Sequence, residues 1–178
     1  MKKYLPVIPL VFLLCFVVNC RDKAAMAELE EFKAQAALEE ANLALAVRAE
    51  EAWANADIET LREICSPDLV WHPPSGPDTS LEEAFESIRQ NRVMFPDGKY
   101  TWDDTFVKGN KVAIRNSFRG THTGDIEGFP ATGNSYESSG LAIARIENGK
   151  VVELWSAEDM LTFYQQLGME LKPKEARK

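Results

Sequence analysis

The segment VVELWSAEDMLTFYQQLG, residues 151–168, contains the carboxylate best placed to do chemistry, Asp159. An apolar strand pattern ends just before this residue and an apolar helix pattern begins just after it. A carboxyl group that acts as a general base near neutral pH needs its pKa raised by an apolar wall or by a neighbouring negative charge. Trp155 could supply that wall, and Glu158 or Glu153 that charge. Asp159 is therefore a candidate general acid/base.

Asp159 also has a purely structural interpretation. An aspartate directly before the helical sequence MLTFYQQLG can accept hydrogen bonds from backbone N–H groups and interact favourably with the helix dipole. Capping lowers the pKa of a carboxyl group, which is the opposite of what a general base requires. Both interpretations remain open at this point, because the sequence does not say what surrounds the carboxylate.

The two histidines lie in sequences that favour contact with a ligand. His122 lies in GTHTG at the end of a predicted strand. Because His122 is an even number of residues away from Val112 and Ile114, its side chain is expected to point to the same, interior side of the strand. We interpret His122 as a helper of Asp159, with a buried structural histidine as the alternative. His72 follows Trp71 and precedes two prolines, which fix an extended backbone at the mouth of a pocket. The alternative is that Trp71 fills the core and that His72 forms a hydrogen bond with a loop carbonyl.

Aromatic residues and these histidines complete the predicted site. The catalytic residues of this hypothesis are Asp159 and His122, and the predicted substrate-binding residues are His72, Trp71, Trp102, Tyr136 and Trp155. The sequence lacks the ligand spacing of a metal site, a serine nucleophile motif and a phosphate-binding glycine loop. We therefore expect neither a metal nor a cofactor.

The elements that must position these residues follow from the sequence pattern. Residues 21–56 are rich in Ala, Glu and Leu without Gly or Pro, which predicts one long helix or two in series. Asp57 is expected to cap a short helix, and Ser80 with Glu83 forms the capping-box pattern of another. Four strand-like segments with hairpin turns then predict an antiparallel sheet. The fold class is α+β, with N-terminal helices packed on a curved sheet.

The N-terminal sequence MKKYLPVIPLVFLLCFVVNC indicates export. It resembles the lipobox of bacterial lipoproteins, in which Cys20 would be acylated, although Asn19 departs from the small residue usual before that cysteine. The expected organisation is a signal peptide over 1–19, a lipid-anchored helical stalk over 20–42, a domain over 43–171 and a polar tail over 172–178. The lipid would hold the protein on the bacterial cell envelope. The formal net charge of -8 argues against a nucleic-acid partner.

The sequences WHPP, GTHTGDIEGFPATG and GKVVELWSAEDMLTFYQQLG resemble the SnoaL-like polyketide cyclases, also called ester cyclases. The resemblance covers roughly residues 43–171. It implies the cone-shaped α+β barrel of the nuclear-transport-factor-2-like superfamily, with an apolar pocket and frequent dimerisation through the sheet face. In the characterised cyclases an aspartate catalyses an intramolecular aldol condensation without a cofactor, and the aspartate that falls in this motif is Asp159.

Two functions of the domain remain open from the sequence, and a third possibility is that the helical stalk from Arg21 to Glu40 pairs in a partner complex. The first is cofactor-free acid/base chemistry, of cyclase or isomerase type, on a small carbonyl or ester compound. The second is a non-catalytic envelope module that binds an apolar ligand or a protein partner. Export favours the second function, because polyketide cyclases act in the cytosol beside the synthase that makes their substrate.

Overall fold

The computed structural model describes residues 8–126, 128, 130–170 and 172, and describes side chains from residue 23 onwards. Residues 1–7 of the predicted signal peptide, the side chains of its remaining residues and of Cys20, and nearly all of the polar tail therefore lie outside what the structure describes. The chain divides into two compact units, residues 1–38 and residues 39–178. In the part of the first unit that is described, the backbone is entirely helical. Among the described residues no helix combines the length and the apolar character needed to cross a membrane.

Helix α1, Ile8–Asn55, is continuous, so the alternative of two helices in series is wrong. Its composition explains this, because no helix-breaking residue interrupts the chain from 21 to 55. Ala56, with a φ of 55°, ends the helix. Asp57 then accepts a hydrogen bond from the backbone N–H of Thr60 and caps α2, Ile58–Ile64, as predicted.

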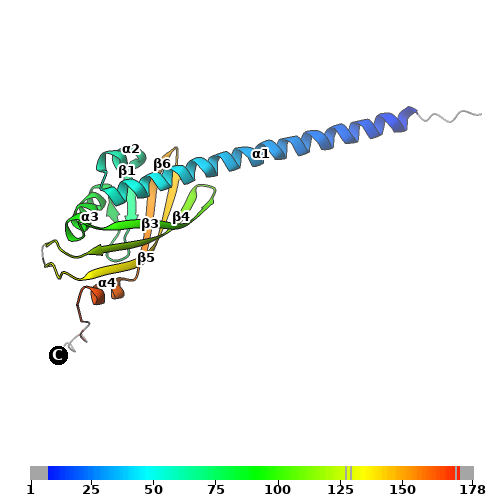
Figure 1. The fold of residues 1–178 in the computed structure, drawn as a ribbon. Helices are drawn as coiled ribbons and strands as arrows, with labels where there is room; N and C mark the ends of the chain where they lie inside the picture. Colours follow the sequence, from blue (N-terminus) through cyan, green and yellow to red (C-terminus); the bar gives the residue numbers. More distant parts are fainter. Residues whose placement is uncertain (1–7, 127, 129, 171, 173–178) are drawn as a thin grey trace, which may run out of the picture. The chain divides into compact units, whose positions relative to one another are not determined.

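Six strands form one sheet in the order β2-β1-β6-β5-β4-β3 (Figure 1). Their bounds are Cys65–His72 for β1, Thr79–Ser80 for β2, Lys99–Lys108 for β3, Lys111–Thr121 for β4, Ser135–Glu147 for β5 and Lys150–Glu158 for β6. Strands β3 to β6 form the predicted antiparallel meander. The sheet is not wholly antiparallel, however, because β1 pairs with β6 in parallel, with Trp71 opposite Leu154. No hairpin joins these two strands, so no short turn imposes opposite directions on them.

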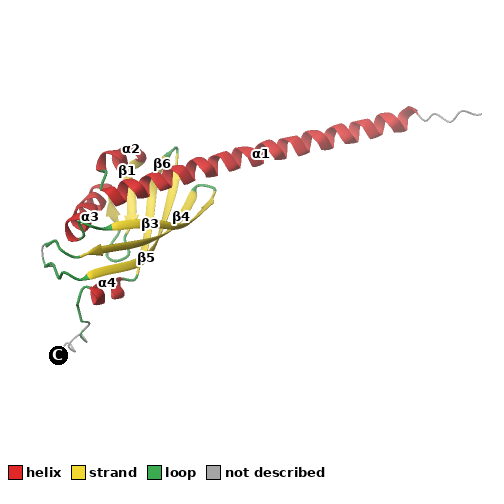
Figure 2. Ribbon diagram, in the orientation of Figure 1, coloured by secondary structure: helices red, strands yellow, loops and turns green. Residues whose placement is uncertain are grey.

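Two further helices complete the domain (Figure 2). Helix α3, Leu81–Met94, begins with the predicted capping box of Ser80 and Glu83. Helix α4, Met160–Gln166, is followed by Gly168, whose φ of 87° is the left-handed conformation that glycine adopts readily after a helix.

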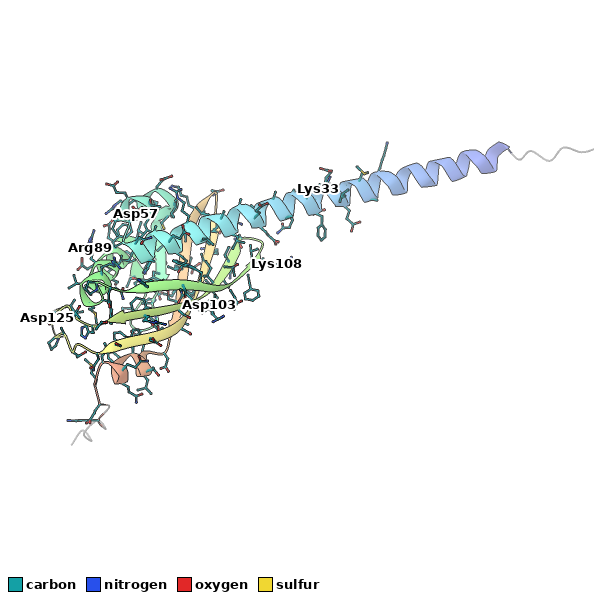
Figure 3. All side chains as sticks on the ribbon, in the orientation of Figure 1. Lys33, Asp57, Arg89, Asp103, Lys108 and Asp125 are labelled. Carbon is teal, nitrogen blue, oxygen red and sulfur yellow. The ribbon has the colours of Figure 1, made fainter. Side chains whose placement is uncertain are left out.

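Helices cover one face of the sheet, here called the concave face. The larger core cluster joins α1, α2 and α3 to this face, and Phe85 and Ile114 are at most 2% exposed within it. A smaller cluster around Phe95, Phe118 and Tyr136 lies nearer to α4. The opposite face of the sheet, here called the convex face, carries charged side chains of β3 to β6, including Asp103, which is labelled on β3 in Figure 3. This arrangement confirms the α+β fold with a curved sheet packed by N-terminal helices.

Candidate functional site

A cavity of about 240 Å³ lies over the concave face. Its wall combines residues of α1, α3, β1, β3, β4, β5 and β6, so it forms only when the helices pack on the sheet. Aromatic rings make up much of the wall: Trp53, Trp71, Tyr100 and Phe118. The carboxyl groups of the wall belong to Glu50 and Glu158.

Glu50 is presented to the cavity by α1. It follows Ala46 by four residues and precedes Trp53 by three, which places all three residues on one side of the helix. Both neighbours pack in the larger core cluster. A smaller space of about 20 Å³, lined by apolar residues apart from Glu50, lies on the same side. Burial in these surroundings raises the pKa of Glu50 to about 7.

Glu158 reaches the cavity from the end of β6. Its Oε1 accepts hydrogen bonds from the hydroxyl of Tyr136 at 2.5 Å and from that of Ser138 at 2.7 Å. Neither bond uses Oε2. Glu158 therefore has a fixed position and retains an oxygen that can accept a bond from a ligand.

The wall also contains the neutral hydrogen-bonding groups of Tyr100 and Asn116. Burial, with the negative charges of Glu158 and Glu50 in addition, raises the pKa of Tyr100, so its phenol remains a hydrogen-bond donor. Asn116 extends over Gly140, where a Cβ atom would lie 2.8 Å from the Asn116 Oδ1. The glycine leaves room for this amide in the wall.

Asp159 is placed as the N-cap of α4 and is exposed. Its Oδ1 accepts the backbone N–H of Thr162 at 3.1 Å, and its Oδ2 accepts the Thr162 hydroxyl at 2.6 Å. These bonds lower the pKa of Asp159. The residue does not belong to the described wall of the cavity, so its geometry is that of a cap. Its catalytic role stays a prediction without support from these contacts.

His122 is completely buried, so its predicted interior orientation is confirmed. Its Nδ1 lies 3.2 Å from the Thr132 hydroxyl, and its ring lies 5.6 Å from that of Phe95. It is not part of the described cavity wall and is not brought together with Asp159 by any described contact. The structure thus supports the alternative of a buried structural histidine.

The structure separates the predicted pair Trp71 and His72 onto opposite faces of the sheet. Trp71 lines the cavity, where its Nε1 donates to the Ser156 hydroxyl at 2.9 Å. His72 stacks on Trp155 on the convex face, with 5.1 Å between ring centroids. Hydrogen bonds to Glu153 and then Asp78 raise the pKa of His72. His72 and Trp155 therefore do not belong to the described wall of the cavity.

The other two predicted binding residues also lie outside the described wall. Trp102 is half-buried against the larger core cluster, and its Nε1 has no hydrogen-bond partner among the described residues. Tyr136 is buried in the smaller cluster, where it holds Glu158. Tyr136 therefore acts on the cavity through Glu158.

Sequence reasoning missed the importance of Glu50 and treated Glu158 only as a neighbouring charge. For Glu50 the available signal was a charged residue at helical spacing between Ala46 and Trp53, both on a buried side. For Glu158 the available signal was the alternation of side chains along β6, which places Leu154 and Glu158 on the same face of the strand. Within the described residues, no group of three His, Cys, Asp or Glu side chains is arranged to hold a metal ion.

The chain is similar to a known family. Residues 44–167 match the SnoaL-like polyketide cyclases. The chain belongs to this family. The match includes β1 to β6, α3, α4 and the part of α1 that carries Glu50.

Solved structures of similar proteins show the same fold. IdmH of Streptomyces antibioticus, a candidate polyketide cyclase, is 32% identical, with a TM-score of 0.63 over 72% of this chain and 99% of IdmH. AclR of Streptomyces galilaeus, a candidate hydroxylase, is 25% identical, with a TM-score of 0.66 over 76% of this chain and 87% of AclR. A SnoaL-like protein of Jannaschia sp. is 18% identical, with a TM-score of 0.69 over 75% of this chain and 96% of its own, and supports the fold alone. Among curated proteins no match was found.

Proposed function

We propose that this SnoaL-like protein binds a small carbonyl or ester compound in the concave cavity and that Glu50 transfers a proton at the carbon beside the carbonyl. The observation that carries this proposal is the position of Glu50, a carboxyl group that lines both the aromatic-walled cavity and the small apolar space. A carboxyl with a pKa of about 7 has both protonation states available near neutral pH, as a proton shuttle requires.

The remaining wall suits the charge that develops in this reaction. Charged Glu50 removes a proton from the carbon, and the electron pair of the broken C–H bond moves to the carbonyl oxygen. The phenol of Tyr100 and the amide of Asn116 are donors on the same wall that can stabilise this oxygen. Transfer of the proton back from Glu50 to another atom of the ligand gives isomerisation. Attack of the enolate carbon on a second carbonyl of the same ligand breaks the C=O π bond and forms an alkoxide, and transfer of the Glu50 proton to this oxygen completes cyclisation.

Exchange of carbon-bound hydrogen tests the proposal without knowledge of the natural substrate. The full chain is incubated with 2-tetralone or phenylacetone in D₂O, and the loss of the proton signal beside the carbonyl is followed by NMR. The wild type should accelerate exchange above buffer, and Glu50→Gln should lower this acceleration by about 10²–10⁴-fold. The exposed neighbour Glu51 provides the control Glu51→Gln, which should exchange like the wild type.

Ligand binding without turnover is the alternative for the same cavity. The printed names of two relatives differ, since one is a candidate cyclase and the other a candidate hydroxylase, so family membership leaves the reaction open. Binding of both ketones without exchange by the wild type would favour this non-catalytic function. Exchange that survives Glu50→Gln would instead exclude Glu50 as the base.

Export and anchoring are a separate proposal that rests on the N-terminal sequence. The lysines, the apolar run and Cys20 support cleavage before Cys20 and its acylation on the cell envelope. Mass spectrometry of the mature protein would find acyl chains on Cys20. An unmodified terminus at another residue would contradict the anchor.

A homodimer through the sheet face is also proposed, as the family resemblance implies. Exposed apolar side chains on β1 and β3 support it: Val70 is 39% exposed and Phe106 68%. Such side chains on an otherwise charged surface favour a protein contact.

A further inference from the structure

The described wall of the cavity contains acids and no bases. Glu50 and Glu158 contribute carboxyl groups, whereas Lys, Arg and His are missing from the described wall. A ligand that carries a carboxylate or phosphate would meet repulsion here without a compensating cation. A positively charged ligand would meet two carboxyl groups, and in Glu158 the bonds from Tyr136 and Ser138 both use Oε1 and not Oε2.

The aromatic side chains point to the same ligand chemistry. Trp53 and Trp71 lie edge to face, with 5.0 Å between ring centroids, and Tyr100 and Phe118 form a second pair at 4.7 Å. The two pairs belong to different elements and both line the cavity. Aromatic rings attract cations through their electron-rich faces, and the attraction is stronger where water is excluded.

We propose that the cavity selects a compound whose apolar body carries a protonated amine, with Glu50 and Glu158 facing the ammonium group. This inference rests on the proposed use of the cavity and narrows its substrate class to amino ketones and amino esters. The formal net charge of -8 adds a long-range field that favours the approach of a cation.

Other titratable groups around the cavity do not reverse this preference. Tyr100 remains neutral because burial and the two glutamates raise its pKa, and Tyr136 donates its hydroxyl to Glu158. Arg92 of α3 acts electrostatically on Tyr100, but its guanidinium donates to the Gly98 carbonyl and is not part of the described wall.

Three probes of similar size separate charge from shape: phenethylamine, 2-phenylethanol and phenylacetate. Their affinities for the full chain are measured by calorimetry at pH 6 and pH 8. At pH 8 phenethylamine should bind at least about tenfold more tightly than 2-phenylethanol, and phenylacetate most weakly. Since Glu50 has a pKa of about 7, its charged fraction rises from pH 6 to pH 8, and amine affinity should rise about tenfold while alcohol affinity stays constant.

Glu50→Gln should bring the affinity for phenethylamine close to that for 2-phenylethanol and leave the alcohol unchanged, and Glu51→Gln should change neither. If Glu50→Gln also no longer binds 2-phenylethanol, the substitution has disrupted the cavity. The change in the affinity of the wild type for phenethylamine between pH 6 and pH 8 then decides whether charge selects the ligand. Equal affinity for amine and alcohol, or tighter binding of phenylacetate, would overturn the charge selection while leaving the proposed function standing. Failure of all three probes to bind, together with absent ketone exchange, would overturn both.

Discussion

Glu50 connects catalysis and stability at the level of a single residue. Its folded pKa of about 7 lies above the ordinary value of 4.5. The folded protein therefore holds this proton more tightly than the unfolded chain does, and stability falls as pH rises from about 4.5 to about 7. The same burial that makes Glu50 a candidate base thus destabilises the protein above neutral pH.

The variant Glu50→Gln has no carboxylate to bury. Its free energy of unfolding at pH 8 should therefore be up to about 3 kcal/mol higher than that of the wild type. At pH 4.5 the two proteins should differ much less. Urea unfolding at both pH values measures the difference, and Glu51→Gln serves as the matched control on the exposed side of α1. If Glu50→Gln raised the free energy of unfolding equally at pH 8 and at pH 4.5, removal of the carboxyl charge would not be the cause of the increase.

Asp159 can be tested with two substitutions that separate capping from catalysis. Asparagine caps helices about as well as aspartate, whereas alanine does not. Asp159→Asn should therefore keep the melting temperature and the ketone exchange, and Asp159→Ala should lower the melting temperature by about 2–4 °C. Thermal unfolding and the exchange assay measure these effects. Loss of exchange in a normally melting Asp159→Asn would restore the catalytic interpretation.

At the level of elements, α1 contributes to the domain from Glu39 onwards. The Glu39 carboxylate accepts the Gly109 backbone N–H at 2.7 Å, and the Asn42 side chain donates to the Gly109 carbonyl at 2.9 Å. Gly109 has a φ of 60° and turns the chain between β3 and β4. Both side chains thus hold this hairpin turn.

A chain that begins at Glu39 should therefore melt within about 2 °C of the full chain, and one that begins at Leu43 should melt several degrees lower. Calorimetry of the two truncated chains makes the comparison. A large loss in the chain that begins at Glu39 would mean that the first compact unit, residues 1–38, also supports the fold.

The elements also show what the sequence could predict. Caps such as Asp57 and the box of Ser80 with Glu83 were predictable, because their bonds join residues three apart. The meander was predictable because short turns impose antiparallel neighbours. The parallel pairing of β1 with β6 was not, since its partners are far apart in the sequence.

The cavity likewise depends on contacts between elements that are far apart in the sequence. Trp71 and the segment that contains Glu158 could be assigned to the cavity from the sequence. The predicted places of His72 and Trp155 in the pocket were wrong, because their strands turn both side chains to the convex face. Glu50 enters the wall only because α1 packs on the concave face, an arrangement that the composition of a helix does not determine.

At the level of the whole molecule, the convex face should determine the oligomeric state. Phe106→Asp places a charge where an apolar side chain is 68% exposed, and should convert a dimer to a monomer with an unchanged circular dichroism spectrum. Phe32→Asp is a matched control on α1, where the side chain is 75% exposed. Analytical ultracentrifugation distinguishes the states. A wild-type monomer, or a dimer retained by Phe106→Asp, would exclude this interface.

The central claim is that Glu50 is the titrating acid/base group of the cavity. Carbon-13 NMR of the glutamate side-chain carboxyls from pH 4 to pH 9, with the Glu50 signal assigned by its loss in Glu50→Gln, tests this claim without a substrate. A midpoint near 7 is expected for Glu50. A midpoint near the ordinary value of 4.5 would mean that Glu50 is solvated, and would contradict its role as the proton shuttle.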